Sequence, residues 1–244
     1  MNKYIITIEY DGTNYVGWQK QDNGNSIQES IEIALAKLTG EKVSIFGAGR
    51  TDSGVHALGQ VAHFVLSKEF KTENIRDGLN QHLRPQPIAV LEARKTDKDF
   101  HARFSAKKRT YEYLIINRRA PLTVDANKYW CVFKKLDTDK MILESKHFIG
   151  KHNFESFRSI DCQAKSAEKT INNIKIIKEA EKITIRVSAK SFLHSQVRIM
   201  VGTLVEIGKG KINNSIEKIL QNKNRSQAGV TAPACGLYLM KIDY

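Results

Sequence analysis

The sequence predicts an α+β protein of two similar lobes, each a mostly antiparallel sheet backed by helices. Two observations predict this class. Segments typical of strands and of helices follow one another in a similar order in both parts of the chain. At 244 residues the chain is also long enough for two units of about 120 residues each. We expect the lobes to be residues 1–104 and 105–244, with the active site in the cleft between them.

The first lobe is expected to open with a strand over Tyr4–Tyr10 that ends at the turn pair Asp11-Gly12. A capping box, Ser26-x-x-Glu29, then predicts a helix that stops at Gly40. The other expected elements are strands over 43–46, 61–66 and 88–93, and a second helix capped by Thr72 and ended by Pro85 and Pro87.

The second lobe is expected to repeat this order. Apolar residues recur at helical spacing from Val197 to Ile207, where Gly208 predicts the helix end. The remaining elements expected here are strands over 111–116, 171–178, 182–189 and 236–244, a helix over 139–149, and a short helix capped by Ser215 that runs to Leu220.

The charge of the chain is concentrated in one lobe. The net charge is +13, yet residues 1–104 carry 13 Lys/Arg and 13 Asp/Glu, so the whole excess lies in residues 105–244. A basic lobe beside a neutral one favours a polyanionic partner, with RNA or DNA first, although a solvated lysine-rich surface has the same composition. Charge alone indicates affinity for phosphate and not a reaction.

Composition also bears on the cellular compartment of the protein and on whether it spans a membrane. The three cysteines are widely spaced and form no C-x-x-C pair, which is typical of reduced thiols in a cytoplasmic protein. The most apolar stretch, Phe192–Ile207, is interrupted by His194, Arg198 and Glu206, so we expect no membrane span.

The segment Gly47–Ala57 is the clearest candidate for a functional loop. It places three glycines, Arg50 and the single carboxylate Asp52 within eight residues. Glycine lets the backbone take positive φ or approach a ligand closely, so this loop can present Asp52 for nucleophilic or electrostatic work. A tight turn in which Asp52 only caps a backbone N–H is the alternative. The spacing matches neither a dinucleotide fingerprint nor a P-loop.

Other common chemistries find no support in the sequence. The histidines do not have the spacing of a metal site, so no metal is expected. There is no G-x-S-x-G elbow for acyl transfer, and the loop lacks the second carboxylate of a glycosidase.

Two residues of the second lobe are candidates for work beside Asp52. Tyr111 follows the basic run Lys107–Arg109, and a flat ring at this place can stack on an extruded base. An equally good interpretation is that Tyr111 belongs to the core of its strand. Arg198 lies among apolar residues that we expect to be mid-helix, so its guanidinium needs an anionic partner. Asp52 is a candidate for that partner.

With these motifs in view, the chain resembles the tRNA pseudouridine synthase A (TruA) family along almost its whole length. The segments that carry the resemblance, in family order, are Tyr10–Thr13 with Gly17–Gln21, Gly47–Ala57, Phe100–Ala106, Arg109–Tyr113, Gly150–Phe157, Phe192–Gly202 and Ala232–Leu237.

The resemblance implies a cytoplasmic, homodimeric isomerase that needs no cofactor and converts uridine to pseudouridine at positions 38, 39 and 40 of the tRNA anticodon stem-loop. It implies that Asp52 is the catalytic aspartate and that Tyr111 packs on the target base. It also implies that Arg198 pairs with the aspartate and that Arg50 takes the place of the flipped base. A non-catalytic RNA-binding protein, or a synthase acting on another RNA, are the alternatives to be tested.

Overall fold

The computed structural model describes residues 2–244, which form two compact units. One unit runs up to Lys107 and also contains Tyr238–Tyr244, and the other is Lys108–Leu237. The first boundary lies close to the expected one, but the final strand joins the first unit, whereas the sequence placed it in the second lobe. Strand partners depend on pairing between distant segments, which local periodicity does not reveal.

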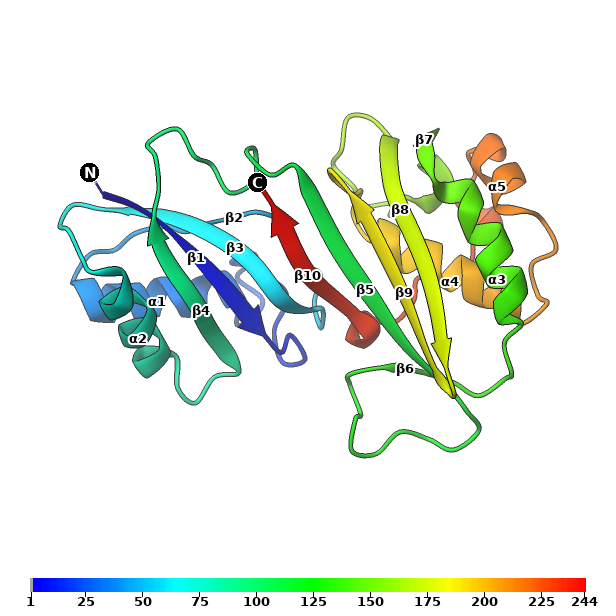
Figure 1. Ribbon diagram of the computed structural model, residues 1–244, viewed down its shortest axis with the longest axis horizontal. Helices are drawn as coiled ribbons and strands as arrows, with labels where there is room; N and C mark the ends of the chain where they lie inside the picture. The colour runs from blue at the N-terminus through cyan, green and yellow to red at the C-terminus, as the bar shows by residue number, and fades with distance from the viewer. Residues whose placement is uncertain (1) are drawn as a thin grey trace. The chain divides into compact units, whose positions relative to one another are not determined.

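The first unit contains a sheet with two helices (Figure 1). Its strands are ordered β4-β1-β3-β10, with β2 paired to β3. The elements are β1 (Asn2–Tyr10), α1 (Ile27–Thr39), β2 (Phe46–Gly47), β3 (His56–Leu66), α2 (Thr72–Leu83), β4 (Ile88–Lys95) and β10 (Leu237–Asp243). β1 is antiparallel to both β3 and β4, while β10 runs parallel to β3 with Tyr238 opposite His56.

The first strand is buried from Tyr4 to Ile6 and then at every second residue, which identifies the core of this unit. Tyr4, Ile6 and Ile8 are fully buried, and the Tyr4 ring stacks on Phe64 of β3 at 5.8 Å. The Tyr4 phenol accepts the N–H of Phe70 at 2.8 Å, just before α2 begins, so this face of the sheet is the one the helices cover. His63, adjacent to Phe64, therefore points to the opposite face.

The N-cap predicted for α1 is confirmed, while the Glu29 carboxylate binds the Lys20 ammonium at 2.9 Å. The Ser26 hydroxyl accepts the N–H of Glu29 at 3.2 Å, and Gly40 ends the helix with φ of +74°. The apolar stripe turns inward, with Ile27, Ile31, Ala34 and Leu35 buried.

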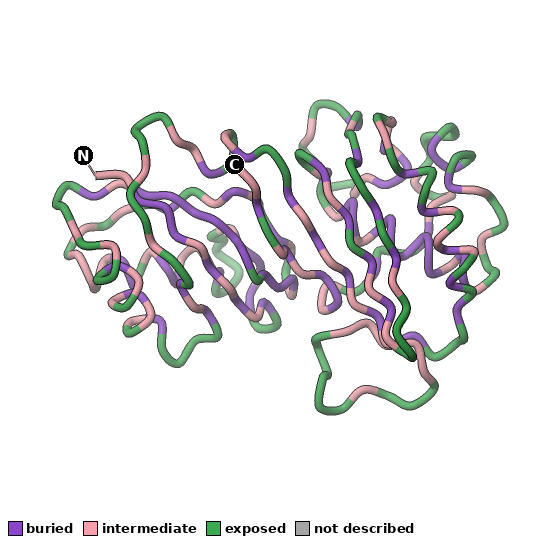
Figure 2. The backbone as a smooth tube through the Cα atoms, in the orientation of Figure 1, coloured by how far each residue is buried: buried purple, intermediate pink, exposed green. Residues whose placement is uncertain are grey.

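The second unit also consists of a sheet with helices, and buried residues occur in its strands and in its helices (Figure 2). Its strands are ordered β5-β9-β8-β7 through antiparallel pairs, and β6 adds to β5 in parallel. The elements are β5 (Lys108–Asn117), β6 (Trp130–Val132), α3 (Thr138–Ser145), β7 (Gly150–Asn153), β8 (Glu168–Glu179), β9 (Lys182–Ala189), α4 (Gln196–Gly208) and α5 (Ile216–Asn222).

The central helix of the second unit is α4, which is buried along almost all of its length. A Cβ added at Gly202 would lie 1.8 Å from the carbonyl oxygen of Val230. Only glycine permits so close an approach, so the segment before Ala232 is fixed against the helix.

Several expected boundaries were wrong. Thr72 does not cap α2, because it is the first helical residue and Lys71 holds the N-cap position without a side-chain bond. The strand expected over 43–46 is only Phe46–Gly47, and the helix expected over 139–149 ends at Ser145 and continues as a single 3-10 turn. The short strands β6 and β7 were not predicted.

Within residues 2–244, no helix is long and apolar enough to cross a membrane. The three cysteines are free thiols.

Candidate active site

The loop Gly47–Ala57 joins β2 to β3 in the first unit, and its beginning is anchored to β3. The Ala48 N–H donates to the carbonyl of Val61 at 2.8 Å. The fully buried Gln60 donates its amide to the carbonyl of Gly49 at 2.8 Å. The chain therefore enters the loop from a fixed position on the sheet.

The residue before Asp52 is held through both its backbone and its side chain. The carbonyl of Thr51 accepts the backbone N–H of Trp18 at 3.1 Å. The Thr51 hydroxyl lies 2.8 Å from the phenol of Tyr10, and both side chains are buried. Thus the segment from Tyr10 to Trp18 sets where the loop turns.

Asp52 opens a tight turn at the tip of this loop. Its carbonyl accepts the N–H of Val55 at 3.2 Å, and Gly54 takes the positive φ of +76° that the turn needs. The Ser53 hydroxyl donates to the carbonyl of Tyr15 at 3.0 Å. The Asp52 residue is half-buried, so it is partly accessible on a backbone that is restrained on both sides.

Close backbone approach explains two glycines outside the loop. A Cβ at Gly12 would lie 2.0 Å from the carbonyl oxygen of Val55, and one at Gly17 would lie 2.6 Å from that of Thr51. The Gly12 N–H also donates to Nδ1 of His56 at 3.1 Å, and the His56 ring stacks on Tyr238 of β10. The end of the loop is therefore bound to the Asp11-Gly12 turn.

Arg50 precedes the buried Thr51 and is exposed. Its guanidinium belongs to the same loop as the carboxylate of Asp52, two residues away. The first unit thus presents one cation and one anion on a loop that is fixed by its neighbours.

Tyr111 lies on β5 of the second unit, opposite Val187 of β9. It is 8% exposed, and its ring meets that of Phe192 edge-on at 5.3 Å. The side chain is therefore held in place by packing.

Arg198 lies in the first turn of α4, not in the middle of a helix as the sequence suggested. The chain before it takes a left-handed conformation at Ser195, which delays the helix start. The Arg198 Nε donates to the carbonyl of Ala232 at 2.8 Å, and the Arg198 carbonyl accepts the Ala232 N–H at 3.1 Å.

Tyr113, two residues after Tyr111 on the same strand, shares this support. Its phenol donates to the carbonyl of Pro233 at 2.7 Å, next to the carbonyl that Arg198 binds. Burial raises the pKa of the Tyr113 phenol well above its ordinary value, so it stays a neutral donor. Arg198 and β5 therefore bind consecutive carbonyls of one segment.

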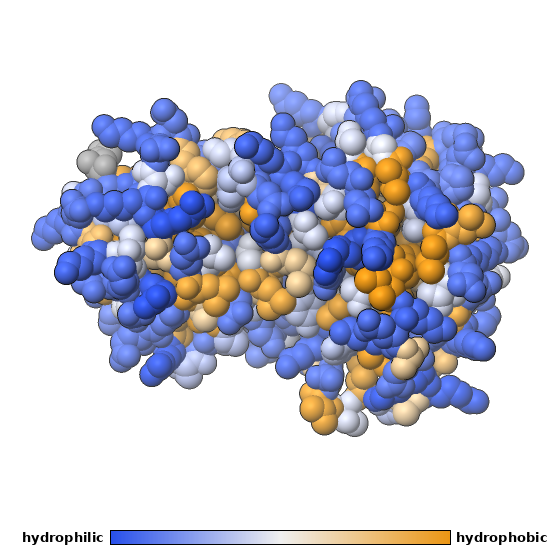
Figure 3. Space-filling view, viewed as in Figure 1, coloured by the Kyte–Doolittle hydropathy of each residue, from blue (hydrophilic) through white to orange (hydrophobic). Residues whose placement is uncertain are grey.

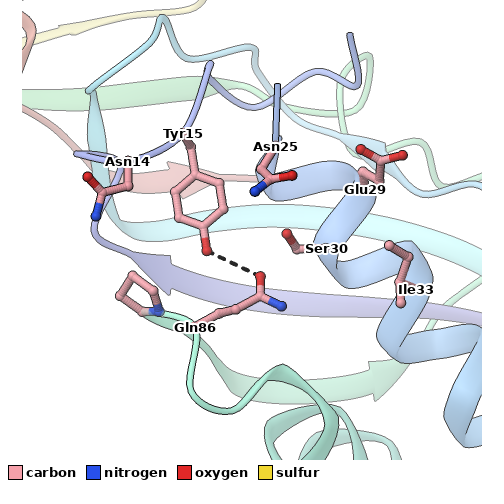
Figure 4. A pocket seen from close by; sticks show the side chains of 8 residues that line it. Asn14, Tyr15, Asn25, Glu29, Ser30, Ile33 and Gln86 are labelled. Carbon is pink, nitrogen blue, oxygen red and sulfur yellow. Dashed lines mark hydrogen bonds between the residues drawn. The ribbon is translucent and has the colours of Figure 1, made fainter. Parts of the chain in front are cut away.

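A pocket of about 250 Å³ lies beside Tyr15, the residue whose carbonyl binds Ser53 of the loop (Figure 4). The Tyr15 phenol points into it and donates to Oε1 of Gln86 at 3.2 Å, and burial raises the pKa of that phenol. Asn14, Asn25 and Glu29 also line it. None of its eight lining residues belongs to Gly47–Ala57, so the pocket is separate from Asp52. Among residues 2–244, no group of three or more metal-ligating side chains comes together.

Comparison with known proteins identifies the family. A family model described as tRNA pseudouridine synthase matches residues 6–105 and 145–244. The chain belongs to this family. The tRNA pseudouridine synthase A of Wolbachia pipientis wMel is 55% identical over 244 residues, covering 99% of this chain and all of that protein. The enzyme of the same name from Maricaulis maris (strain MCS10) is 50% identical over 245 residues, covering 100% and 98%.

Family membership makes the protein an isomerase. The family model matches two segments of the chain, in agreement with two units that each combine a sheet with helices. The predicted α+β class with two similar lobes is therefore confirmed. The crystal structure of a Cbf5–Nop10–Gar1 complex covers 96% of this chain and 57% of that chain at a TM-score of 0.37 and 10% identity, too low to add to this assignment.

The sequence reasoning missed the residues that hold the loop. Tyr10, Gly12 and Trp18 bond to it from segments far back in the chain, and Gln60 bonds to it from the following strand. A usable signal was present, because Tyr10-Asp11-Gly12 and Gly17-Trp18 are among the segments that carry the family resemblance.

Proposed function

We propose that this protein converts uridine to pseudouridine in the anticodon stem-loop of tRNA, at positions 38, 39 and 40, with Asp52 as the essential catalytic group. The observation that carries the proposal is Asp52 at the tip of a loop whose neighbours fix its backbone, in a chain that belongs to a pseudouridine synthase family. The relatives' names give tRNA as the substrate class.

The reaction redistributes bonds and adds nothing. The bond between ribose C1′ and uracil N1 breaks, the uracil turns, C1′ bonds to C5, C5 loses its proton and N1 gains one. Since reactant and product are isomers, neither a redox cofactor nor a group carrier is required. Asp52 starts the cleavage by attack on the sugar, by attack on the base, or by removal of the C2′ proton.

The other residues bind and orient the uridine. Because a base inside a helix is hidden, the target must leave the stack, and exposed Arg50 is suited to take its place. The packed ring of Tyr111 offers a flat face to the flipped base. Arg198, fixed by Ala232, supplies a cation to balance the Asp52 carboxylate.

The charge distribution supports an RNA substrate. The unit Lys108–Leu237 carries 24 Lys/Arg and 12 Asp/Glu, whereas the other unit carries 15 and 14. The face shown in Figure 3 is largely hydrophilic, with apolar side chains visible in patches. Phosphate binding by such a surface releases counterions, so the logarithm of the tRNA affinity should fall linearly with the logarithm of salt concentration. Salt-independent binding would contradict this contribution of phosphate contacts to the affinity.

We further propose that the enzyme is a cytoplasmic homodimer.

The decisive experiment is tritium release from tRNA labelled at uracil C5. Wild-type protein should release tritium, and Asp52→Asn, which keeps the side-chain size and removes the charge, should release essentially none. The matched control is Asp77→Asn, which neutralises an exposed aspartate of α2 that pairs with its neighbour Arg76.

A wild-type rate of tritium release by Asp52→Asn would refute the catalytic role of Asp52. Binding of tRNA by the wild-type protein without any tritium release would favour a non-catalytic RNA-binding protein. Release from rRNA but not from tRNA would make the protein a synthase for another RNA.

A further inference from the structure

Four aromatic rings pack together on the first unit, beginning at Phe46, which directly precedes the loop Gly47–Ala57. Phe46 of β2 lies opposite His63 of β3 in the antiparallel pair, and their rings stack at 5.2 Å. The His101 ring lies 4.6 Å from His63 and 5.9 Å from Phe46, and Phe104 lies 4.4 Å from His101. We call these residues, Phe46, His63, His101 and Phe104, the aromatic row.

In the aromatic row the two phenylalanine rings are exposed, His63 is buried and His101 is half-buried. Phe104 is 75% exposed and Phe46 is 52% exposed, whereas His63 is 4% exposed. A large ring left in water forgoes the stabilisation that burial gives such side chains, about 1.5–3 kcal/mol. Two exposed phenylalanine rings in one packed group of aromatic side chains therefore indicate a surface that a ligand covers.

The exposed rings do not sit on a loose loop. Nδ1 of His63 accepts the N–H of Ala102 at 3.2 Å, and Nδ1 of His101 accepts the N–H of Arg103 at 3.2 Å. The backbone N–H of His101 donates to the Ser105 hydroxyl at 3.0 Å. These bonds fix the segment that carries Phe104, so little conformational entropy is lost when a ligand covers its ring.

Two cations, Lys3 and Arg103, lie near the aromatic row. The Lys3 ammonium donates to the carbonyl of Phe100 at 2.8 Å, and the Arg103 guanidinium lies 5.9 Å from the centre of the Phe104 ring. Burial lowers the pKa of His101 most, and the charges of Lys3 and Arg103 lower it further. Lys3 also lowers the pKa of His63. The exposed rings thus lie in a field that attracts anions.

We propose that Phe104 and Phe46 form a stacking platform for an unpaired nucleotide of the RNA substrate, separate from the uridine that reacts. The inference rests on the proposed function in taking RNA as the substrate. An exposed ring beside cations suits a base together with its phosphate, and only an unpaired base offers its face for stacking. A second copy of this chain is a poorer occupant, because a symmetric contact would bring Lys3 and Arg103 of both copies together.

Three substitutions at Phe104 test the platform through KM and kcat for tritium release from tRNA. Phe104→Ala should raise KM about tenfold and leave kcat within twofold, since the nucleotide is bound but does not react. Phe104→Leu should behave like the alanine variant because it keeps apolar bulk without the π face. Phe104→Trp should restore the wild-type KM. A wild-type KM in Phe104→Ala, or full activity in Phe104→Leu, would overturn the proposal.

Controls separate this test from the proposed function. Leu91→Ala removes a 46% exposed side chain of β4 outside the aromatic row and should change neither constant. A short single-stranded RNA containing 2-aminopurine tests the platform without turnover, because stacking quenches its fluorescence. Quenching by wild type and Leu91→Ala but not by Phe104→Ala would support the platform even if no tritium is released from tRNA. Equal quenching by all three proteins, or a change of oligomeric state in Phe104→Ala with unaltered quenching, would refute it.

Discussion

The phenol of Tyr10 and the hydroxyl of Thr51 lie 2.8 Å apart inside the first unit, one residue from Asp52. Tyr10 ends the first strand and Thr51 belongs to the loop, so this bond joins the sheet to the turn that presents the carboxylate. The side chains are 4% and 8% exposed, which leaves little water to replace a lost partner. The position of Asp52 therefore depends on a residue 42 positions before it in the chain.

Tyr10→Phe should reduce both stability and turnover. Removing the phenol hydroxyl leaves the Thr51 hydroxyl short of a partner, which should lower the free energy of unfolding by about 1–2 kcal/mol. Greater freedom of the loop should lower kcat about tenfold under conditions where the protein is fully folded. Urea unfolding and tritium release measure the two effects.

Tyr4→Phe is the matched control for this prediction. The Tyr4 phenol is equally buried but bonds the backbone of Phe70, so the variant should lose stability and keep kcat. In the double variant Tyr10→Phe/Thr51→Val both partners are gone, and the loss of stability should be smaller than the sum of the single losses. Additive losses would show that the two hydroxyls do not interact.

Gly12→Ala should disable the enzyme, whereas Gly40→Ala should not. The methyl group at position 12 would lie 2.0 Å from the backbone oxygen of Val55, which cannot move without displacing the turn of Asp52. We expect a loss of about 3 kcal/mol in stability and at least 100-fold in kcat. At Gly40 the added methyl meets nothing within 4 Å, and its φ of +74° alone should cost about 1 kcal/mol. Comparable kcat values for the two variants would contradict this account of the loop.

The elements that the sequence predicts well are those whose signals are local. Ser26 and Gly40 mark the ends of α1 within the helix itself, and both positions are confirmed. β6 and β7 are three and four residues long, too short for a periodic pattern to stand out. The partner of the last strand is about 180 residues away along the chain, so its parallel pairing with β3 leaves no local trace.

The same distinction applies to the candidate site. The glycine content of the loop predicts a turn at Asp52, and the Val55 N–H closes that turn. That Tyr10 and Trp18 hold Thr51 could not be predicted, because the contact depends on how the first strand packs. The late start of α4 likewise depends on the left-handed backbone of Ser195, a residue that does not favour this conformation. The catalytic roles of Asp52, Tyr111, Arg198 and Arg50 stay predictions.

Lys71→Asp should stabilise the protein. Lys71 occupies the N-cap of α2 with extended backbone and makes no side-chain bond to the helix. An aspartate there can accept a free N–H of the first turn and interacts favourably with the helix dipole, so the free energy of unfolding should rise by about 1 kcal/mol. Ser26→Ala, which removes the existing cap of α1, should lower it by a similar amount. A neutral or destabilising result for Lys71→Asp in urea unfolding would mean that the cap position is constrained by other contacts.

The stability of the first unit should fall as the pH drops from about 6.5, and His63 should cause part of that fall. Burial, with help from His101 and Lys3, lowers the pKa of His63 to about 4 from an ordinary value of 6.5. Between these values the unfolded chain binds a proton that the folded protein does not, so acid favours unfolding and the stabilising contribution is complete only above pH 6.5. From pH 6.5 to pH 5 this single group should remove up to about 1.5 kcal/mol.

His63→Asn isolates this contribution, because the asparagine oxygen can replace Nδ1 as acceptor for the Ala102 N–H and does not titrate. Its free energy of unfolding, measured in urea at pH 7, 6 and 5, should fall less steeply than that of wild type, whatever the two values are at pH 7. Both proteins carry the same carboxylates, so protonation of these groups toward pH 5 contributes equally to the two curves and cancels from the comparison. Parallel curves for the two proteins would mean that His63 is protonated to the same extent folded and unfolded, and that a charged imidazole is tolerated in the middle of the aromatic row.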